Sequence, residues 1–261
     1  MQIKDNENYK YRKTKDFVYL SSAIKNDKAN LSSKLVFLHG HTAGYLEDLN
    51  QFAEKLRPVF GQIILPYGWY ADKKAEFKRE IIFGYLNTMA EGVAPTDYIG
   101  PYNYNNHPVI ISKNHKWYEK TPTDDSIVKT HQYLQQITND SKSMETDGNG
   151  NLPLPVIGGF FEGGSTAVEL ILRFGDEFSR CVAINPTYRD VIDILSGVIM
   201  PHQKPIFLVV NSDEPDTTLE STRLMAIALE DKGFNVSFEK MSLGLGNECT
   251  DELLKILTSM V

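Results

Sequence analysis

One segment of the chain, residues 154–174, constrains the fold more than any other. It reads LPVIGGFFEGGSTAVELILRF: an apolar run typical of a buried strand, a glycine-flanked turn, and a helical pattern that begins at once. A strand that passes directly into a helix needs a tight turn, and the flanking glycines let the two backbones approach without side-chain collision. The residue at such a turn projects above the sheet, and here it is Phe161. The segment therefore predicts a βα unit with an aromatic side chain at the end of its strand.

The rest of the chain alternates short apolar runs with longer helical patterns. This alternation is typical of βαβ units around a parallel sheet, and 261 residues suit one large domain. We therefore predict a single α/β domain over residues 1–261, with a mostly parallel twisted sheet and helices on both faces. Strands are expected at 34–40, 61–68, 154–160, 180–186, 205–211 and, nearer an edge, 234–241. Helices are expected at 46–56, 124–137, 164–174, 219–231 (with Gly233 as the stop) and 250–260.

Residues 70–123 break the alternation and are rich in Tyr, Asn, Pro and His. Loops of this length in a compact domain are usually lids or binding loops. We expect an ordered lid near the carboxyl ends of the strands, where such sheets bind ligands. Its side chains are expected to form an aromatic wall for a planar or apolar ligand, or else a hydrophobic plug over the site. They are Tyr102, Tyr104, His107, His115, Trp117 and Tyr118.

The composition excludes several classes of function. A net charge of -7 argues against nucleic acid or an anionic membrane as a partner. Cys181 and Cys249 are too few for a disulfide framework or a four-thiolate metal site, and Cys181 is expected to be buried. No apolar run has the length of a membrane span or a signal peptide, so we expect a cytoplasmic protein. The His, Cys and Asp spacings predict no metal, and we expect no cofactor.

The glycine-flanked turn resembles the nucleophile elbow of one branch of the α/β-hydrolases. The phospholipase/carboxylesterase (acyl-protein-thioesterase-like) branch has an elbow like G-F-S-Q-G-G. Here residues 159–164 read G-F-F-E-G-G, so Phe161 falls on the nucleophile of that family. The run LVFLHGHTAG is similar to the family's L-H-G-x-G oxyanion segment, with His39 and Gly40 matched. The resemblance implies an α/β-hydrolase fold.

This resemblance covers about residues 30–261, apart from a longer insertion between roughly 70 and 114. Residues 116–119, KWYE, match a site where the family often has an aromatic pair. The family's catalytic acid follows a strand in a D-P-x-V-P-like turn. In the matching turn of this chain, Pro215 aligns the acid with Glu214, and a shifted turn would use Asp213 or Asp216.

The resemblance also implies that the general base is missing. The family has G-x-G-H where this chain has G-L-G-N, so Asn247 stands in place of the histidine. Phe161 has no nucleophilic atom and Asn247 cannot titrate, so ordinary serine esterase activity is expected to be absent. An alternative reading makes Ser165 the nucleophile, but it moves the turn four residues into the helix.

Three functions stay open on the sequence. The first is a catalytically degenerate homologue that binds a small apolar or aromatic ligand, or a partner, in the former active-site pocket. The second is a repurposed cyclase, lyase or isomerase in which Glu162, Glu214 or His41 transfers protons. The third is an authentic carboxylesterase or thioesterase. Glu162 has a structural alternative, in which it pairs with a neighbouring group. His131 and His202 are expected to be structural, and the resemblance leaves a homodimer open.

Overall fold

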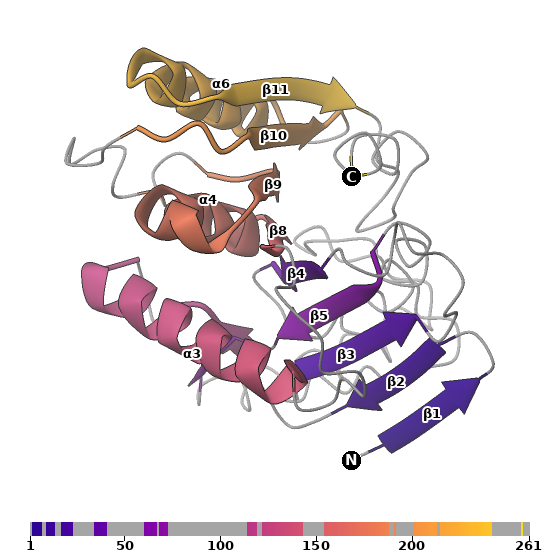
Figure 1. Cartoon of the computed structure of the whole chain (residues 1–261). Coiled ribbons are helices and arrows are strands. Elements are labelled where there is room, and N and C mark those ends of the chain that lie inside the picture. The colour runs from indigo at the N-terminus through magenta and orange to yellow at the C-terminus, as the bar shows by residue number, and fades with distance from the viewer. Residues whose placement is uncertain are drawn as a thin grey trace, which may run out of the picture.

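The computed structural model of the chain describes thirteen stretches of residues. They are 2–6, 9–13, 17–22, 34–40, 60–66, 68–72, 114–118, 122–142, 154–187, 191, 201–212, 215–241 and 257. Their centre is a nine-stranded sheet with the order β1-β2-β3-β5-β4-β8-β9-β10-β11 (Figure 1).

The six strands predicted from the apolar runs are present and parallel to one another. They are β4 (Lys34–Leu38), β5 (Gln62–Pro66), β8 (Val156–Phe160), β9 (Arg180–Ile184), β10 (Ile206–Asn211) and β11 (Val236–Met241). Strands β4, β5 and β8 are buried along their whole length. Continuous apolar runs are typical of parallel strands that are covered on both faces. β11 is more exposed, as predicted for a strand at the edge.

Three N-terminal strands extend the sheet on the other side. β1 (Gln2–Asn6), β2 (Tyr9–Lys13) and β3 (Phe17–Ser22) form an antiparallel series, and β3 pairs antiparallel with β5. The sequence analysis predicted no strands there. Residues 2–13 carry charged and amide side chains and no apolar run, so they lack the pattern that marks a buried strand.

The order of the parallel strands reverses at β4. The chain moves from β4 to β5 on one side and then crosses back to β8 on the other side. Where the strand order reverses, the carboxyl ends of neighbouring strands leave a crevice, and α/β sheets bind ligands there. The ends of β4 and β8 are therefore the expected position of a site.

Four helical segments are described besides Leu257: α3 (Asp124–Lys142), α4 (Glu162–Phe174), the short 3-10 helix η2 (Gly175–Glu177) and α6 (Asp216–Asp231). The three predicted helices at 124–137, 164–174 and 219–231 are confirmed, each somewhat longer than expected. Gly233, with φ of 86°, follows α6 as predicted for a C-terminal stop. The helices predicted at 46–56 and 250–260 lie outside the described residues, except for helical Leu257.

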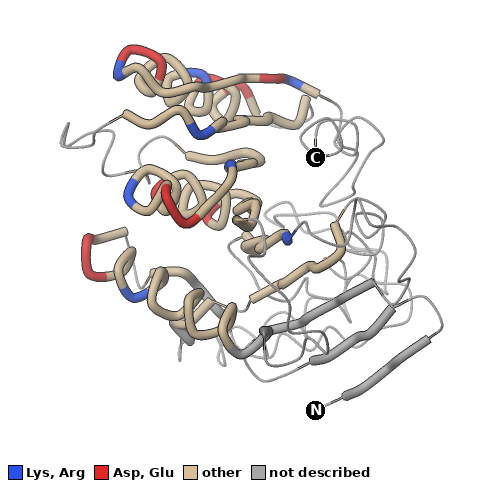
Figure 2. The backbone as a smooth tube through the Cα atoms, in the orientation of Figure 1, with Lys and Arg blue, Asp and Glu red and all other residues tan. Residues whose placement is uncertain are grey.

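Among the residues that Figure 2 colours, the charged ones lie mainly on the helices and on β11, and few lie on the central strands. None of the described helices combines the length and apolar character that crossing a membrane requires. Within the insertion, β6 (Tyr70–Asp72) and β7 (Asn114–Lys116) form a two-stranded antiparallel sheet. Most of the insertion lies outside the described residues, so its role as a lid stays a prediction.

Candidate functional site

Phe161 is the turn residue between β8 and α4. Its backbone has φ of 47° and ψ of -116°, a conformation that residues with a side chain rarely adopt. Two hydrogen bonds hold the turn: the Phe161 N–H donates to Ile184 O at 2.8 Å, and the Phe161 carbonyl accepts from Ser165 N at 2.8 Å. The Phe161 side chain is not buried, because the residue keeps 37% of its surface exposed. An aromatic ring is thus presented at the strand end where hydrolases carry a nucleophile.

Glycines make this turn sterically feasible. A Cβ added to Gly159 would lie 2.5 Å from Gly163 C, and one added to Gly163 would lie 2.5 Å from Leu38 O. One added to Gly164 would lie 3.0 Å from Gly159 O. The first turn of α4 therefore lies directly against the ends of β4 and β8, with no room for side chains between them.

The Phe161 ring lies beside the backbone of Gly40, just past the end of β4. A Cβ added to Gly40 would lie 3.4 Å from Phe161 Cδ2 and 3.5 Å from Phe160 O. The structure thus brings together two of the residues that the sequence assigned to the site. The ring and the glycine backbone thus lie together where the sequence analysis expects the floor of the site.

The His39 side chain does not face solvent, and it forms hydrogen bonds with two backbone segments. Its side chain is buried, its Nε2 lies 2.9 Å from Gly68 N, and its Nδ1 lies 2.6 Å from Gly40 O. A backbone N–H can only donate, so Nε2 must be the acceptor and Nδ1 must carry the proton that it donates to Gly40 O. This fixes the neutral Nδ1–H tautomer and ties the end of β4 to the segment that follows β5.

Trp117 connects His39, just past the end of β4, with Glu162, at the start of α4. It is fully buried, its indole Nε1–H donates to His39 O at 3.0 Å, and its ring lies 4.9 Å from the His39 ring. Its backbone N–H donates to Glu162 Oε1 at 2.9 Å, and its carbonyl accepts from the Thr130 hydroxyl at 3.3 Å. Tyr118 beside it belongs to the same buried core. Two of the residues that were expected to form a ligand wall or a plug are thus buried in the core.

Glu162 opens α4 immediately after the turn. It is buried to 5% exposure, and one carboxylate oxygen accepts the Trp117 N–H. A carboxylate is favourable at a helix N-terminus, where the backbone N–H groups of the first turn carry partial positive charge. The contact matches the alternative in which Glu162 pairs with a neighbouring group. Its catalytic role stays a prediction.

Ser165 does not occupy the turn. It is fully buried in α4, its hydroxyl accepts from Thr187 N at 2.8 Å, and it lies 3.3 Å from Phe161 O. The turn conformation belongs to Phe161, four residues earlier. The alternative reading that makes Ser165 a nucleophile at the elbow is therefore not the observed geometry.

Asn185, at the end of β9, was missed by the sequence analysis. It is the second described non-glycine residue with positive φ, at 51°, and it is buried. Its side-chain oxygen accepts from Asn211 N at 2.8 Å, so it ties the ends of β9 and β10 together. An asparagine between a strand and a proline was the available signal, because Asn tolerates left-handed backbone at turns.

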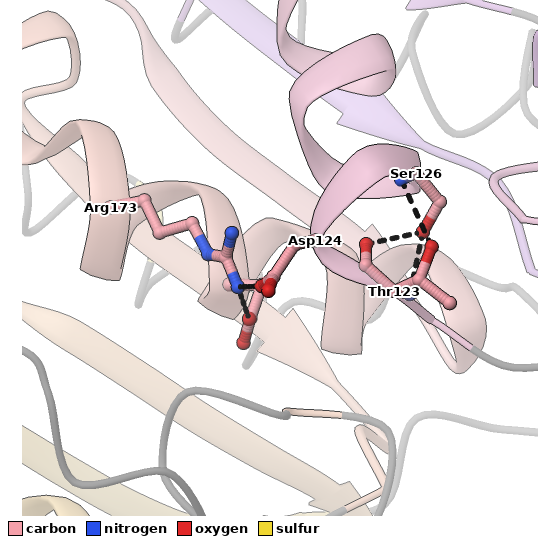
Figure 3. Close-up of polar contacts among 5 residues, drawn as sticks. Thr123, Asp124, Ser126 and Arg173 are labelled. Atoms are coloured by element: carbon pink, nitrogen blue, oxygen red, sulfur yellow. Dashed lines mark hydrogen bonds and ion pairs between the residues drawn. The ribbon is translucent and has the colours of Figure 1, made fainter.

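The far end of α4 is fixed to α3 by charged groups. Arg173 Nη2 lies 2.6 Å from Asp124 Oδ1 and 3.1 Å from Oε1 of the fully buried Glu169 (Figure 3). Next to this contact, Thr123 and Ser126 cap α3 reciprocally: the Thr123 N–H donates to Ser126 Oγ at 2.8 Å, and the Ser126 N–H donates to Thr123 Oγ1 at 3.2 Å (Figure 3). The orientation of α4, and with it the elbow, is thus set at both ends.

His131 and His202 have structural contacts, as predicted. His131 lies 2.9 Å from Glu177 Oε1 and stacks on Phe174 at 3.6 Å. His202 accepts from Lys204 N at Nδ1, so its Nε2–H donates to Ile171 O at 2.7 Å. Within the described stretches, no group of three or more His, Cys, Asp and Glu residues could hold a metal ion.

Burial raises the pKa of the Cys181 thiol, which keeps it protonated and unreactive, as predicted for a structural cysteine. Of the other predicted site residues, His115 lies on β7 and Asp216 begins α6. The rest lie outside the described residues: His41, Tyr102, Tyr104, His107, Asp213, Glu214 and Asn247. Cys249 lies there too.

The strand order, the reversal at β4 and the strained turn before α4 define an α/β-hydrolase fold. Solved structures show the same fold at low sequence identity. A carboxylesterase of Bacillus cereus matches with a TM-score of 0.56 and 14% identity, over 94% of this chain and 92% of that one. A carboxylesterase of Mesorhizobium loti matches with a TM-score of 0.55 and 13% identity, over 96% and 93%.

Esterase PE8 matches with a TM-score of 0.54 and 16% identity, over 89% of this chain and 92% of its own. The predicted α/β-hydrolase architecture is thus confirmed, and the similar structures carry esterase and carboxylesterase names. No model of a known protein family matches the sequence. No curated protein matches it either.

Proposed function

We propose that the chain is a catalytically degenerate homologue of serine hydrolases that binds a small apolar or aromatic ligand, or a partner, at the former active site. The carrying observation is Phe161, which combines elbow backbone angles with a side chain that has no nucleophilic atom. Loss of the nucleophile alone removes the acyl-enzyme route. The pairing of Phe161 with a substituted base at Asn247 comes from the sequence resemblance.

The conformation of Phe161 supports a binding role. A non-glycine residue in a sparsely populated backbone region costs of order 1–3 kcal/mol, and such residues cluster at functional sites. The ring is also partly exposed, so the strained turn does not serve to fill the core. An apolar ligand that covers the ring would remove this exposed apolar surface from water.

The rival functions have less support among the described residues. Hydrolysis through Ser165 is disfavoured because its hydroxyl is buried and bonded to Thr187. Proton transfer by Glu162 in a repurposed enzyme is disfavoured because its carboxylate is buried against Trp117. Proton transfer by Glu214 or His41 rests on the sequence alone. A cytoplasmic location likewise rests on the sequence.

The binding proposal is tested with indole as a neutral aromatic probe. Its binding to the full chain is measured by saturation-transfer NMR. We expect transfer to indole in the wild type and its loss in Phe161→Ala. Leu224→Ala is the matched control, because Leu224 is a comparably exposed apolar residue on α6, at 46%. Equal transfer in all three proteins would overturn the proposal.

A second arm tests the loss of hydrolysis. The full chain is incubated with a fluorophosphonate probe and with p-nitrophenyl acetate. We expect no labelled serine and no turnover above the buffer rate. Labelling of any serine, mapped by peptide mass, would instead establish an authentic esterase. Hydrolysis of p-nitrophenyl acetate that is lost in Glu162→Gln but present in Phe161→Ala would instead show ester hydrolysis assisted by Glu162, and it would contradict the degenerate homologue.

A further inference from the structure

Strand β11 is the last strand of the sheet, and it has one described partner. It pairs in parallel with β10 from Val236 to Met241, and no other strand in the described part of the chain pairs with it. An unpaired strand edge carries backbone donors and acceptors that can pair with another strand. The question is which partner this edge fits, and the answer does not depend on the ligand proposed above.

The hydrogen bonds to β10 determine which groups of β11 face the open edge. Ile206 N–H donates to Asn235 O at 2.9 Å, and Ser212 N–H donates to Met241 O at 2.7 Å. In a parallel ladder the bonding residues alternate, so Ser237, Glu239 and Met241 direct their backbone groups at β10. The N–H and C=O groups of Val236, Phe238 and Lys240 therefore point away from β10, toward the edge.

This alternation restricts the registers in which β11 can pair with itself. In an antiparallel pair, directly opposed residues either both exchange hydrogen bonds or both do not. Around a two-fold axis, one residue must therefore face its own copy at the centre. The strand spans Val236–Met241, so only a centre at Phe238 or Glu239 pairs most of its length.

Charge decides between these two registers. A centre at Glu239 places two exposed carboxylates directly opposite each other, and like charges in that position are destabilising. A centre at Phe238 instead opposes Phe238 with Phe238, Ser237 with Glu239, and Val236 with Lys240. Like charges never meet in this register, and the serine hydroxyl faces a carboxylate acceptor. Figure 2 shows the acidic and basic residues side by side on β11.

We propose that β11 pairs antiparallel with β11 of a second copy of this chain, with the two-fold axis at Phe238, so that the sheet is continuous across a homodimer. The interface is isologous, as closed symmetric dimers require. Lys240 does not block this pairing as an edge lysine usually would, because its opposite residue is Val236.

Two substitutions at one position test the register. Ser237→Lys places a lysine opposite Glu239 twice in the dimer, whereas Ser237→Glu places a carboxylate there twice. Sedimentation over a wide concentration range should give a dimer Kd that is roughly tenfold lower for Ser237→Lys and roughly tenfold higher for Ser237→Glu. The same changes at exposed Gln136 on α3 are the controls, and they should leave the Kd unchanged.

A wild type that stays monomeric at all concentrations would overturn the proposal. So would a dimer whose Kd is the same for both Ser237 variants, since another surface would then hold it. Amide exchange provides a second test that needs no variant. On dilution, the N–H groups of Phe238 and Lys240 should lose protection while those of Ser237 and Glu239 keep it. If the protection of Phe238 and Lys240 does not change on dilution, the β11 edge does not hold a dimer. A peptide strand bound at this edge would then be no support for the proposal.

Discussion

Phe161 and Asn185 both have a positive φ at the ends of neighbouring strands, and they use this backbone conformation differently. Their φ angles are 47° and 51°, and the N–H of Phe161 donates to the carbonyl of the residue before Asn185. Asn185 is buried, and its side chain bonds the backbone of β10. Phe161 is partly exposed, and no side-chain hydrogen bond caps the helix that it precedes.

The difference indicates that the backbone conformation of Asn185 stabilises the fold, whereas that of Phe161 presents a side chain at the candidate site. At Asn185 the strained backbone positions an amide oxygen for Asn211 N–H, so the protein recovers the cost as stability. Among the described residues, the Phe161 side chain makes no hydrogen bond, and its ring lies beside the Gly40 backbone. Residues whose backbone strain is not offset by a stabilising contact are found mostly at functional sites. The comparison therefore supports a binding role for Phe161.

The largest expected effect concerns the glycines that fix the turn. Gly163→Ala would place a Cβ 2.5 Å from Leu38 O, so we expect a loss of more than about 3 kcal/mol of unfolding free energy, or no folded protein. Urea denaturation measures it. Gly233→Ala is the control: its φ is also positive, at 86°, but its nearest neighbour would be 3.8 Å away. We expect about 1–2 kcal/mol there. Equal losses would mean that the turn is not held by close packing.

Asn185→Ala should cost about 2–3 kcal/mol. The substitution leaves the buried Asn211 N–H without its acceptor and keeps a side chain at positive φ. Asn185→Gly removes the backbone strain but does not restore the hydrogen bond. It should therefore recover only part of the lost unfolding free energy. Denaturation curves of the three proteins separate the two contributions. Full recovery in Asn185→Gly would show that the hydrogen bond contributes nothing.

At Phe161 we expect the usual order of alanine and glycine to invert. Phe161→Gly should be more stable than Phe161→Ala by about 1–2 kcal/mol, because only glycine adopts this backbone without strain. At exposed Leu224 within α6, glycine should be less stable than alanine by about 1 kcal/mol. Thermal and urea unfolding of the four variants provide the comparison. An alanine variant that is as stable as glycine at position 161 would remove the strain argument.

The smallest effect on stability is expected at Gly40. A Cβ there would be in ordinary contact with Phe161 Cδ2, at 3.4 Å, so Gly40→Ala should change the unfolding free energy by less than about 1 kcal/mol. The added methyl group nevertheless occupies the surface beside the ring, so we expect weaker saturation transfer to indole. Unchanged transfer together with unchanged stability would place the ligand on the other side of Phe161.

The sequence was sufficient for elements whose pattern is local. The runs of β4, β8 and β9 are apolar apart from Lys34 and Arg180 at their starts, and the glycines around Phe161 mark the turn without any knowledge of the fold. Cys181 could be assigned to the interior for the same reason. The polar strands β1 and β2 could not be predicted, because strand formation in such sequences depends on the neighbouring strand more than on intrinsic preference. β3 reads FVYLSS, and its short run of aromatic and aliphatic residues was a signal that the sequence analysis missed.

Contacts between distant residues were equally beyond the sequence. Glu162 was expected either to act on a substrate or to pair with a neighbour, and its partner proved to be the backbone of Trp117, 45 residues away. No pattern encodes such a contact. Trp117 and Tyr118 were expected in a ligand wall or in a plug over the site, and neither the composition nor the family's aromatic pair could distinguish those positions from the core in which both lie.

The hydroxyl of Thr130 has a practical consequence for spectroscopy. It accepts from Trp69 Nε1 at 2.8 Å and lies 3.3 Å from Trp117 O, and these are the only two tryptophans in the sequence. The intrinsic indole emission of the protein therefore originates entirely at the junction of α3 with the strand ends. A change in its wavelength or polarisation would report on that junction without an introduced label.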